Sequence, residues 1–118
     1  MKDKLPRYKG KDFNIILCND RLIVKLNRQF KAKNNPTDVL AFNFNNPPGK
    51  GLFGEIYIDL QQAKRQAKKY NIEFDEEVTR LTFHGILHLL GYRDDNAKNR
   101  KKMWKIQEEY LANGYRRR

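Results

Sequence analysis

The spacing of apolar residues along the first half of the chain predicts three short strands and one amphipathic helix. The β-rich run at 13–18 predicts the first strand, and the runs at 38–44 and 55–58 predict the other two. The helix is predicted from apolar residues at helical spacing, which are Leu22, Ile23, Leu26 and Phe30. Turn-forming residues at 45–51 separate the last two strands, which are therefore expected to form a hairpin.

The second half of the chain has the periodicity of helices. A helix over 60–70 carries an apolar stripe, with Asp59 in the position of an N-cap. A helix over 75–90 begins with three acidic residues, which suit the positive end of a helix dipole, and stops before Gly91. A last helix is predicted over about 96–112. Its apolar residues are Met103, Ile106 and Tyr110, with Trp104 and Leu111 beside them.

This order of one strand, one helix, two strands and three helices predicts an α+β fold, a small mixed β-sheet packed with helices. The 118 residues fit a single domain, 1–118, with a basic tail at about 115–118. The one cysteine, Cys18, has no partner for an internal disulfide. The sequence contains neither a recognisable signal peptide nor a stretch long enough to cross a membrane, so a cytoplasmic protein is expected.

The charge balance points to a polyanionic partner. The chain has 25 lysines and arginines against 14 acidic residues, a formal net charge of +11. A charge of this size attracts nucleic acid, because neutralising phosphates releases counterions. Solubility alone is the other explanation, because net charge indicates partners and not chemistry.

The two histidines of the chain, His84 and His88, lie four positions apart in the third predicted helix. That helix is apolar on most sides, so it is expected to be central and buried. Both imidazoles then project from one face and can bind one metal ion. The alternative is a pair of core histidines hydrogen-bonded to the backbone. The residue after His84 is Gly85, where the zinc-protease motif has its glutamate base, and this argues against a peptidase.

A third ligand is expected from the loop after the helix. Gly91 lets the chain turn back and bring Asp94, or its neighbour Asp95, toward the two imidazoles. Two histidines and one carboxylate leave at least one position for water, which is typical of a catalytic site. The sequence therefore predicts one divalent metal ion held by His84, His88 and Asp94.

With these residues the sequence resembles the bacterial YbeY family of rRNA maturation factors. The family motif His-Gly-x-Leu-His-Leu-x-Gly-Tyr-Asp-His corresponds to residues 84–94, and Pro-Thr-(Asp/Asn)-Val-Leu-Ser-Phe corresponds to 36–42. The Gly-(Asp/Glu)-Ile stretch falls on 54–56, and the family's Met and Glu positions resemble Met103 and Glu108-Glu109. The similarity extends over roughly residues 13–112.

The resemblance implies a cytoplasmic, single-strand-specific and metal-dependent endoribonuclease. It implies action in the 3′-end maturation of small-subunit rRNA and in ribosome quality control. The expected cofactor is one divalent ion, Zn²⁺ before others, in a cleft beside the sheet. The expected partners are RNA and the ribosome, with ribosomal or assembly proteins also open, and neither DNA nor a membrane is expected.

Two departures from the family pattern bear on the site. The third ligand of most members is a histidine, and Asp94 stands there, which could shift metal preference toward harder ions such as manganese or magnesium. An arginine of the family corresponds to Lys31, which keeps the charge but lacks the bidentate fork that suits phosphate.

Roles follow for the remaining candidates. Lys31, Lys33 and Arg93 are predicted to contact RNA and offset charge on the phosphate. Lys31 and Asp38 are the candidate catalytic residues, with Asp38 orienting or supporting the site. No glutamate adjoins the histidines to act as a base, so the sequence leaves open whether water or the RNA 2′-hydroxyl attacks.

Two rival functions remain at this stage. The first is a non-catalytic assembly factor that binds rRNA or a ribosomal protein, with the metal as a structural element, because metal binding can supply folding energy to a small core. The second is a metallohydrolase acting on peptides or small molecules, which the missing glutamate and the net charge disfavour.

Overall fold

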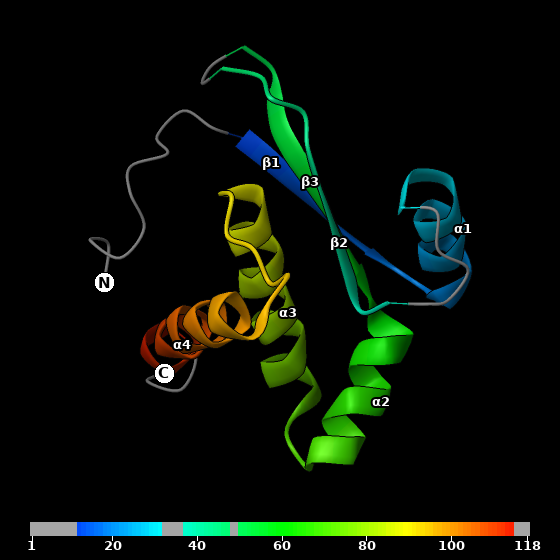
Figure 1. Cartoon of the computed structure of the whole chain (residues 1–118). Coiled ribbons are helices and arrows are strands. Elements are labelled where there is room, and N and C mark those ends of the chain that lie inside the picture. The colour runs from blue at the N-terminus through cyan, green and yellow to red at the C-terminus, as the bar shows by residue number, and fades with distance from the viewer. Residues whose placement is uncertain (1–11, 32–36, 48–49, 115–118) are drawn as a thin grey trace.

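The computed structural model describes residues 12–31, 37–47 and 50–114. Figure 1 shows a small sheet with helices on both sides. The elements in chain order are β1 (Asp12–Cys18), α1 (Asp20–Lys31), β2 (Val39–Asn43), β3 (Leu52–Asp59), α2 (Leu60–Tyr70), α3 (Phe74–Leu89) and α4 (Ala97–Gly114).

The sheet is mixed, with the strand order β1-β3-β2. β1 pairs with β3 in parallel, and β2 pairs with β3 antiparallel, so the predicted hairpin is confirmed. The order of elements and the α+β class are also as predicted. β3 starts at Leu52, three residues earlier than expected, because Leu52 and Gly54 pair with β1 and Gly54 pairs with β2. The basic tail at 115–118 lies outside the described residues.

β1 is the least covered strand. Among the described residues it is hydrogen-bonded to β3 alone, and it therefore forms one edge of the sheet. The side chains of Ile15 and Leu17 are 45% and 54% exposed. They alternate with Ile16 and share a face with Phe13, which packs against the core. The core thus covers only the start of this strand.

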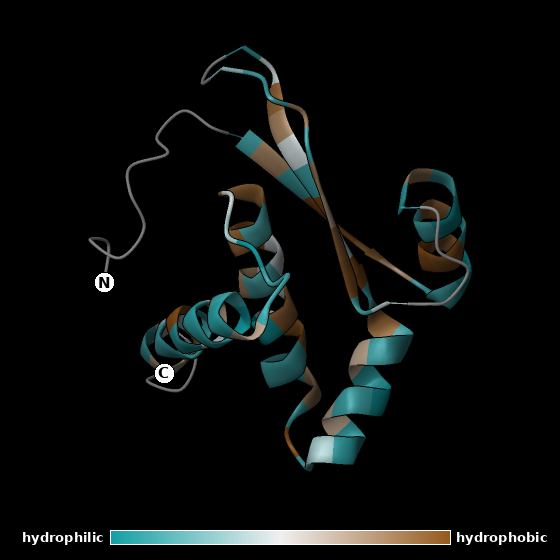
Figure 2. Ribbon diagram, in the orientation of Figure 1, coloured by the Kyte–Doolittle hydropathy of each residue, from teal (hydrophilic) through white to brown (hydrophobic). Residues whose placement is uncertain are grey.

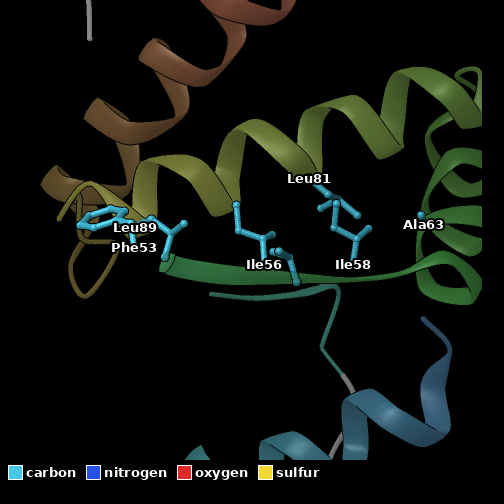
Figure 3. Close-up of a cluster of buried hydrophobic side chains, with 7 residues drawn as sticks. Phe53, Ile56, Ile58, Ala63, Leu81 and Leu89 are labelled. Atoms are coloured by element: carbon cyan, nitrogen blue, oxygen red, sulfur yellow. The ribbon is translucent and has the colours of Figure 1, made fainter. Parts of the chain in front are cut away.

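α3 packs across one face of β2 and β3 and forms the core with them. Figure 3 shows Leu81 of α3 next to Ile58 of β3 and Leu89 of α3 next to Phe53, with Ile56 between the two pairs. The helix lies very close to the sheet at Gly85, where an added Cβ would lie 2.5 Å from a methyl carbon of Ile56. Glycine at this position therefore sets how closely the helix carrying the histidines approaches the sheet.

The remaining helices surround this core. α1 lies on the opposite face of the sheet from α3, while α2 and α4 each pack against α3. Asp59 caps α2, as predicted, by accepting hydrogen bonds from the backbone of Gln61 and Gln62. Figure 2 shows hydrophobic residues concentrated in the strands and α3, and largely hydrophilic surfaces on α2 and α4. Within the described residues, none of the helices is both long and apolar enough to cross a membrane.

Candidate metal centre

Both histidines lie near the C-terminal end of α3 and are half-buried. The side chains of His84 and His88 are 28% and 30% exposed. One helical turn separates them, so both rings project from the same side of the helix. Their Nε2 atoms are 3.1 Å apart, and the rings meet edge to face. One nitrogen of each ring is therefore brought to the same point.

The loop after α3 supplies a carboxylate to this point. The chain reverses through Gly91, whose φ of +96° lies in the left-handed region that favours glycine. The reversal places Oδ2 of Asp94 3.3 Å from Nε2 of His88 and 3.8 Å from Nε2 of His84. The predicted group of two imidazoles and a carboxylate is thus assembled in space.

Asp95, the other carboxylate that the sequence left open, is engaged elsewhere. One of its oxygens accepts a hydrogen bond from Arg93 and the other accepts one from Asn99. The geometry therefore favours Asp94 over Asp95 as the third donor. Arg93, a predicted RNA contact, extends from the same loop with 72% of its side chain exposed.

A residue of α4 orients the ring of His84 and selects its tautomer. Nδ1 of His84 lies 2.8 Å from Oε1 of Gln107, and the amide nitrogen of Gln107 donates to Glu108. Because the amide oxygen can only accept, Nδ1 carries the proton and donates it to Gln107. In the neutral imidazole this tautomer leaves the lone pair on Nε2, the nitrogen that lies beside His88 and Asp94. A ligating histidine fixed in this way is common in metal sites.

A metal ion fits this donor set. One donor atom from each of His84, His88 and Asp94 lies within 4.8 Å of the others. Bonds of about 2.1 Å in a tetrahedron place donor atoms ~3.4 Å apart, and the three separations found here are 3.1, 3.3 and 3.8 Å. Among the described residues no fourth histidine, cysteine or acidic residue joins the group. Three-donor sets with an open position are typical of catalytic sites.

The electrostatic surroundings keep His88 available for a metal. Burial lowers the pKa of His88 below its usual 6.5, and the neighbouring His84 lowers it further, although Asp94 opposes both. A lowered pKa favours the neutral imidazole at neutral pH, and the neutral form is the one that binds metals.

A second polar cluster lies one turn earlier on α3. Arg80 donates hydrogen bonds to Glu76 and Glu77 of its own helix and to Glu108 of α4. The Arg80 side chain is only 12% exposed, and Glu77 is buried. Because Gln107 donates to Glu108, this cluster connects to His84 through one side chain.

Asp38 is brought to the side of α3 that carries the histidines. It directly precedes β2, and its backbone carbonyl accepts a hydrogen bond from the amide of Asp59. Asp38 and His84 both line one cavity of about 480 Å³. The two residues therefore border the same space, and the role of Asp38 there stays a prediction.

Lys31 is placed differently from the histidines. Its Nζ lies 5.3 Å from the centre of the Phe42 ring. Side chains alternate along a strand, and Val39 of β2 faces α3, so Phe42 faces the opposite side of the sheet, toward α1. In this structure the sheet lies between Lys31 and the histidines. Lys33, the other predicted lysine, lies outside the described residues.

Two residues of the site were missed by sequence reasoning, Gln107 and Arg80. Gln107 is 3% exposed and lies one turn from Met103 and one turn from Leu111 on the buried side of α4. A polar residue within an apolar stripe was the available signal. For Arg80 the available signal was the spacing of Glu76 and Glu77, which lie four and three positions before it on the same helix. Its third partner, Glu108, becomes visible only once α3 and α4 are packed.

Fold and donor set together define a candidate α+β metalloprotein, and comparison with known proteins identifies its family. A family model described as Endoribonuclease YbeY matches residues 1–114. Proteins named endoribonuclease YbeY from Chloroherpeton thalassium and Persephonella marina are 35% and 39% identical to the chain. These matches cover 87% and 86% of this chain and 72% and 69% of those proteins. The chain therefore belongs to the YbeY family.

A solved structure supports the same relationship. The solution structure of TM1509 from Thermotoga maritima superposes with a TM-score of 0.63 and is 33% identical in sequence. The match covers 94% of this chain and 71% of that protein. The resemblance drawn from the histidine motif is thus confirmed at the level of family and fold.

Proposed function

We propose that this protein is a metal-dependent endoribonuclease that cleaves phosphodiester bonds in single-stranded RNA. The observation that carries the proposal is the convergence of His84, His88 and Asp94 on one point with an open side, in a family named for endoribonuclease activity. The net charge of +11 suits a polyanionic substrate.

Each residue of the centre has a role that its position supports. His84, His88 and Asp94 would hold one divalent ion, for which Zn²⁺ is the first candidate. The ion, when bound, supplies Lewis-acid stabilisation of a phosphoryl oxygen and lowers the pKa of a water molecule. Gln107 keeps the proton of His84 on Nδ1, so that Nε2 stays free as a donor.

Other side chains would contact the RNA directly. Asp38 lines the cavity beside His84, where its carboxylate can accept a proton from the substrate strand and orient it. Arg93 is exposed in the loop that carries Asp94 and can offset charge on the phosphate. Lys31 and Lys33 would bind the strand where it leaves the centre, and for Lys31 this means RNA that reaches the α1 face of the sheet.

We further assign the activity to the 3′-end maturation of small-subunit rRNA and to ribosome quality control in the cytoplasm. This assignment rests on the family resemblance and includes ribosomal or assembly proteins as partners. It makes structured rRNA fragments with unpaired 3′ ends the substrates to test first.

The decisive experiment measures bound metal and RNA cleavage in the same preparations. The wild type, His88→Ala and the control Asp95→Asn are purified without chelators. Metal content is measured by mass spectrometry, and cleavage is followed on single-stranded and duplex forms of one rRNA fragment. We expect the wild type and Asp95→Asn to hold about one ion and to cleave the single strand. His88→Ala should lose both properties and keep its circular dichroism spectrum.

A different result would favour the assembly-factor function. If the wild type holds metal but cleaves no RNA, and His88→Ala unfolds, the metal is structural. If all three proteins cleave RNA after chelation, the centre is not the catalytic site.

A further inference from the structure

A cavity of about 480 Å³ adjoins the metal centre at His84, which is the one metal donor among its lining residues. It lies between α2, α3 and α4, and its walls include Tyr70, Ile72, Leu81 and Trp104. Cavities of about 300–1,000 Å³ are typical of small-molecule sites. The space is therefore large enough for a nucleotide-sized group.

Two aromatic side chains of this cavity are unusually exposed. Tyr70, at the end of α2, is 59% exposed, and Trp104, on α4, is 55% exposed. The sequence predicted Met103 on the apolar side of this helix with Trp104 beside it, and Met103 is indeed the buried one of the two. Each ring has one cation beside it, Arg80 at 5.9 Å from the centre of the Trp104 ring and Lys69 at 5.5 Å from the centre of the Tyr70 ring. More than half of each side chain is still exposed, so each ring retains surface on which a planar group can stack.

The polar groups of the walls are mostly engaged with one another. Gln66 donates to Glu77, Glu77 accepts from Arg80, and Gln107 bonds to His84. The aromatic rings are therefore the main surfaces left for a ligand. Basic residues accompany them, because Arg100 and Lys101 lie one turn before Trp104 and are exposed.

We propose that this cavity is a binding subsite for one unpaired nucleobase of the RNA, stacked against Trp104 and Tyr70. The inference rests on the proposed function, since His84 belongs both to the cavity wall and to the metal centre. A strand with a phosphate at the centre would present a neighbouring base here. Such a base must leave its own stack, so the subsite selects single strands. Stacking on a ring accepts every base, so little base preference is expected.

The subsite can be tested without cleavage, because Trp104 is the only tryptophan of the chain. Its fluorescence in metal-stripped His88→Ala is titrated with uridine and adenosine monophosphates, and with ribose 5-phosphate as the probe without a base. We expect saturable quenching by both nucleotides and none by ribose 5-phosphate. Adding Tyr70→Ala should weaken nucleotide binding by about tenfold, whereas Tyr70→Phe should preserve it. The exposed aromatic Phe44, which is outside the cavity lining, provides the control Phe44→Ala.

Activity separates failure of this inference from failure of the proposed function. With metal bound, Trp104→Ala should raise KM for single-stranded RNA by about tenfold at unchanged metal content, and Trp104→Phe should restore it. Cleavage with unchanged KM in Trp104→Ala, or equal quenching by ribose 5-phosphate, overturns the nucleobase subsite and leaves the nuclease intact. Base-dependent quenching in a protein that cleaves no RNA supports the subsite and overturns the nuclease.

Discussion

Two polar clusters lie one turn apart on α3 and differ in where their positive charge comes from. In the first, Arg80 satisfies the carboxylates of Glu76, Glu77 and Glu108. In the second, two imidazole nitrogens and the carboxylate of Asp94 face one another. No lysine or arginine side chain is found bonded to that carboxylate among the described residues.

The difference separates a structural cluster from a binding one. A buried arginine with three carboxylate partners is complete within the chain and holds α3 against α4. Two imidazole nitrogens and a carboxylate at close range are a donor set that a cation from outside can join. Gln107 bonds to both His84 and Glu108, so the Arg80 cluster also orients a histidine of the metal centre.

Removing the positive charge of Arg80 should produce the largest effect, a loss of stability. Arg80→Met is expected to lower the free energy of unfolding by about 3–5 kcal/mol, because it leaves buried Glu77 without its counter-charge. Urea denaturation followed by circular dichroism measures this. Chelation of the wild type is the contrasting condition, since the open centre should lose its metal without unfolding. Unfolding on chelation, together with a stable Arg80→Met protein, would reverse the assignment of the two clusters.

Removing the hydrogen bond between Gln107 and His84 should weaken metal binding without unfolding the chain. Gln107→Met keeps the size of the side chain but removes the acceptor for Nδ1 of His84, so metal affinity should fall by about 10–100-fold. Competition with a fluorescent chelator measures the affinity. Asn113→Ala, at an exposed position of the same helix, is the control. Equal affinities in the two variants would show that Gln107 does not orient the histidine.

Replacing Asp94 in the candidate metal centre should alter which metal the centre prefers. Asp94→His replaces a hard oxygen by a nitrogen, so the ratio of Mn²⁺ to Zn²⁺ dissociation constants should rise, on the order of tenfold. The same substitution one residue later, Asp95→His, should leave the ratio unchanged. A shift caused by Asp95→His instead would identify Asp95 as the donor.

The smallest expected effect concerns the titration of His88 in the metal-free protein. Burial and His84 lower its pKa, so the His88 resonance should titrate below 6.5 in nuclear magnetic resonance spectra. Because the unfolded chain then takes up the proton first, the metal-free protein should lose stability as the pH falls through 6.5. A pKa above 6.5, with stability rising in acid, would contradict this environment.

The order of elements could be predicted because strands and helices leave different periods in the sequence. The start of β3 could not, since Leu52 belongs to the strand only through pairing with β1, and Gly54 only through pairing with β1 and β2. His84 and His88 were predictable from their spacing alone. The choice between Asp94 and Asp95 was not, because it depends on the path of the loop after Gly91.

Contacts between distant segments limited the prediction of the site more than any local feature. Gln107 meets His84 across 23 positions, and no periodicity encodes that contact. The separation of Lys31 from the histidines depends on which face of the sheet α1 covers. The cavity between α2 and α4 exists only after both helices have packed on α3.

The edge position of β1 also has a consequence for how this chain behaves in solution. Within the part of the chain that the structure describes, β1 pairs with β3 alone, and this edge together with the exposed Ile15 and Leu17 favours edge-to-edge association of strands. The net charge of +11 opposes such association only while the repulsion between molecules is unscreened. The Debye length falls from about 10 Å in 0.1 M salt to about 3 Å in 1 M salt. Light scattering should therefore reveal larger particles as salt is added, and concentrated stocks of this chain should keep best at low ionic strength.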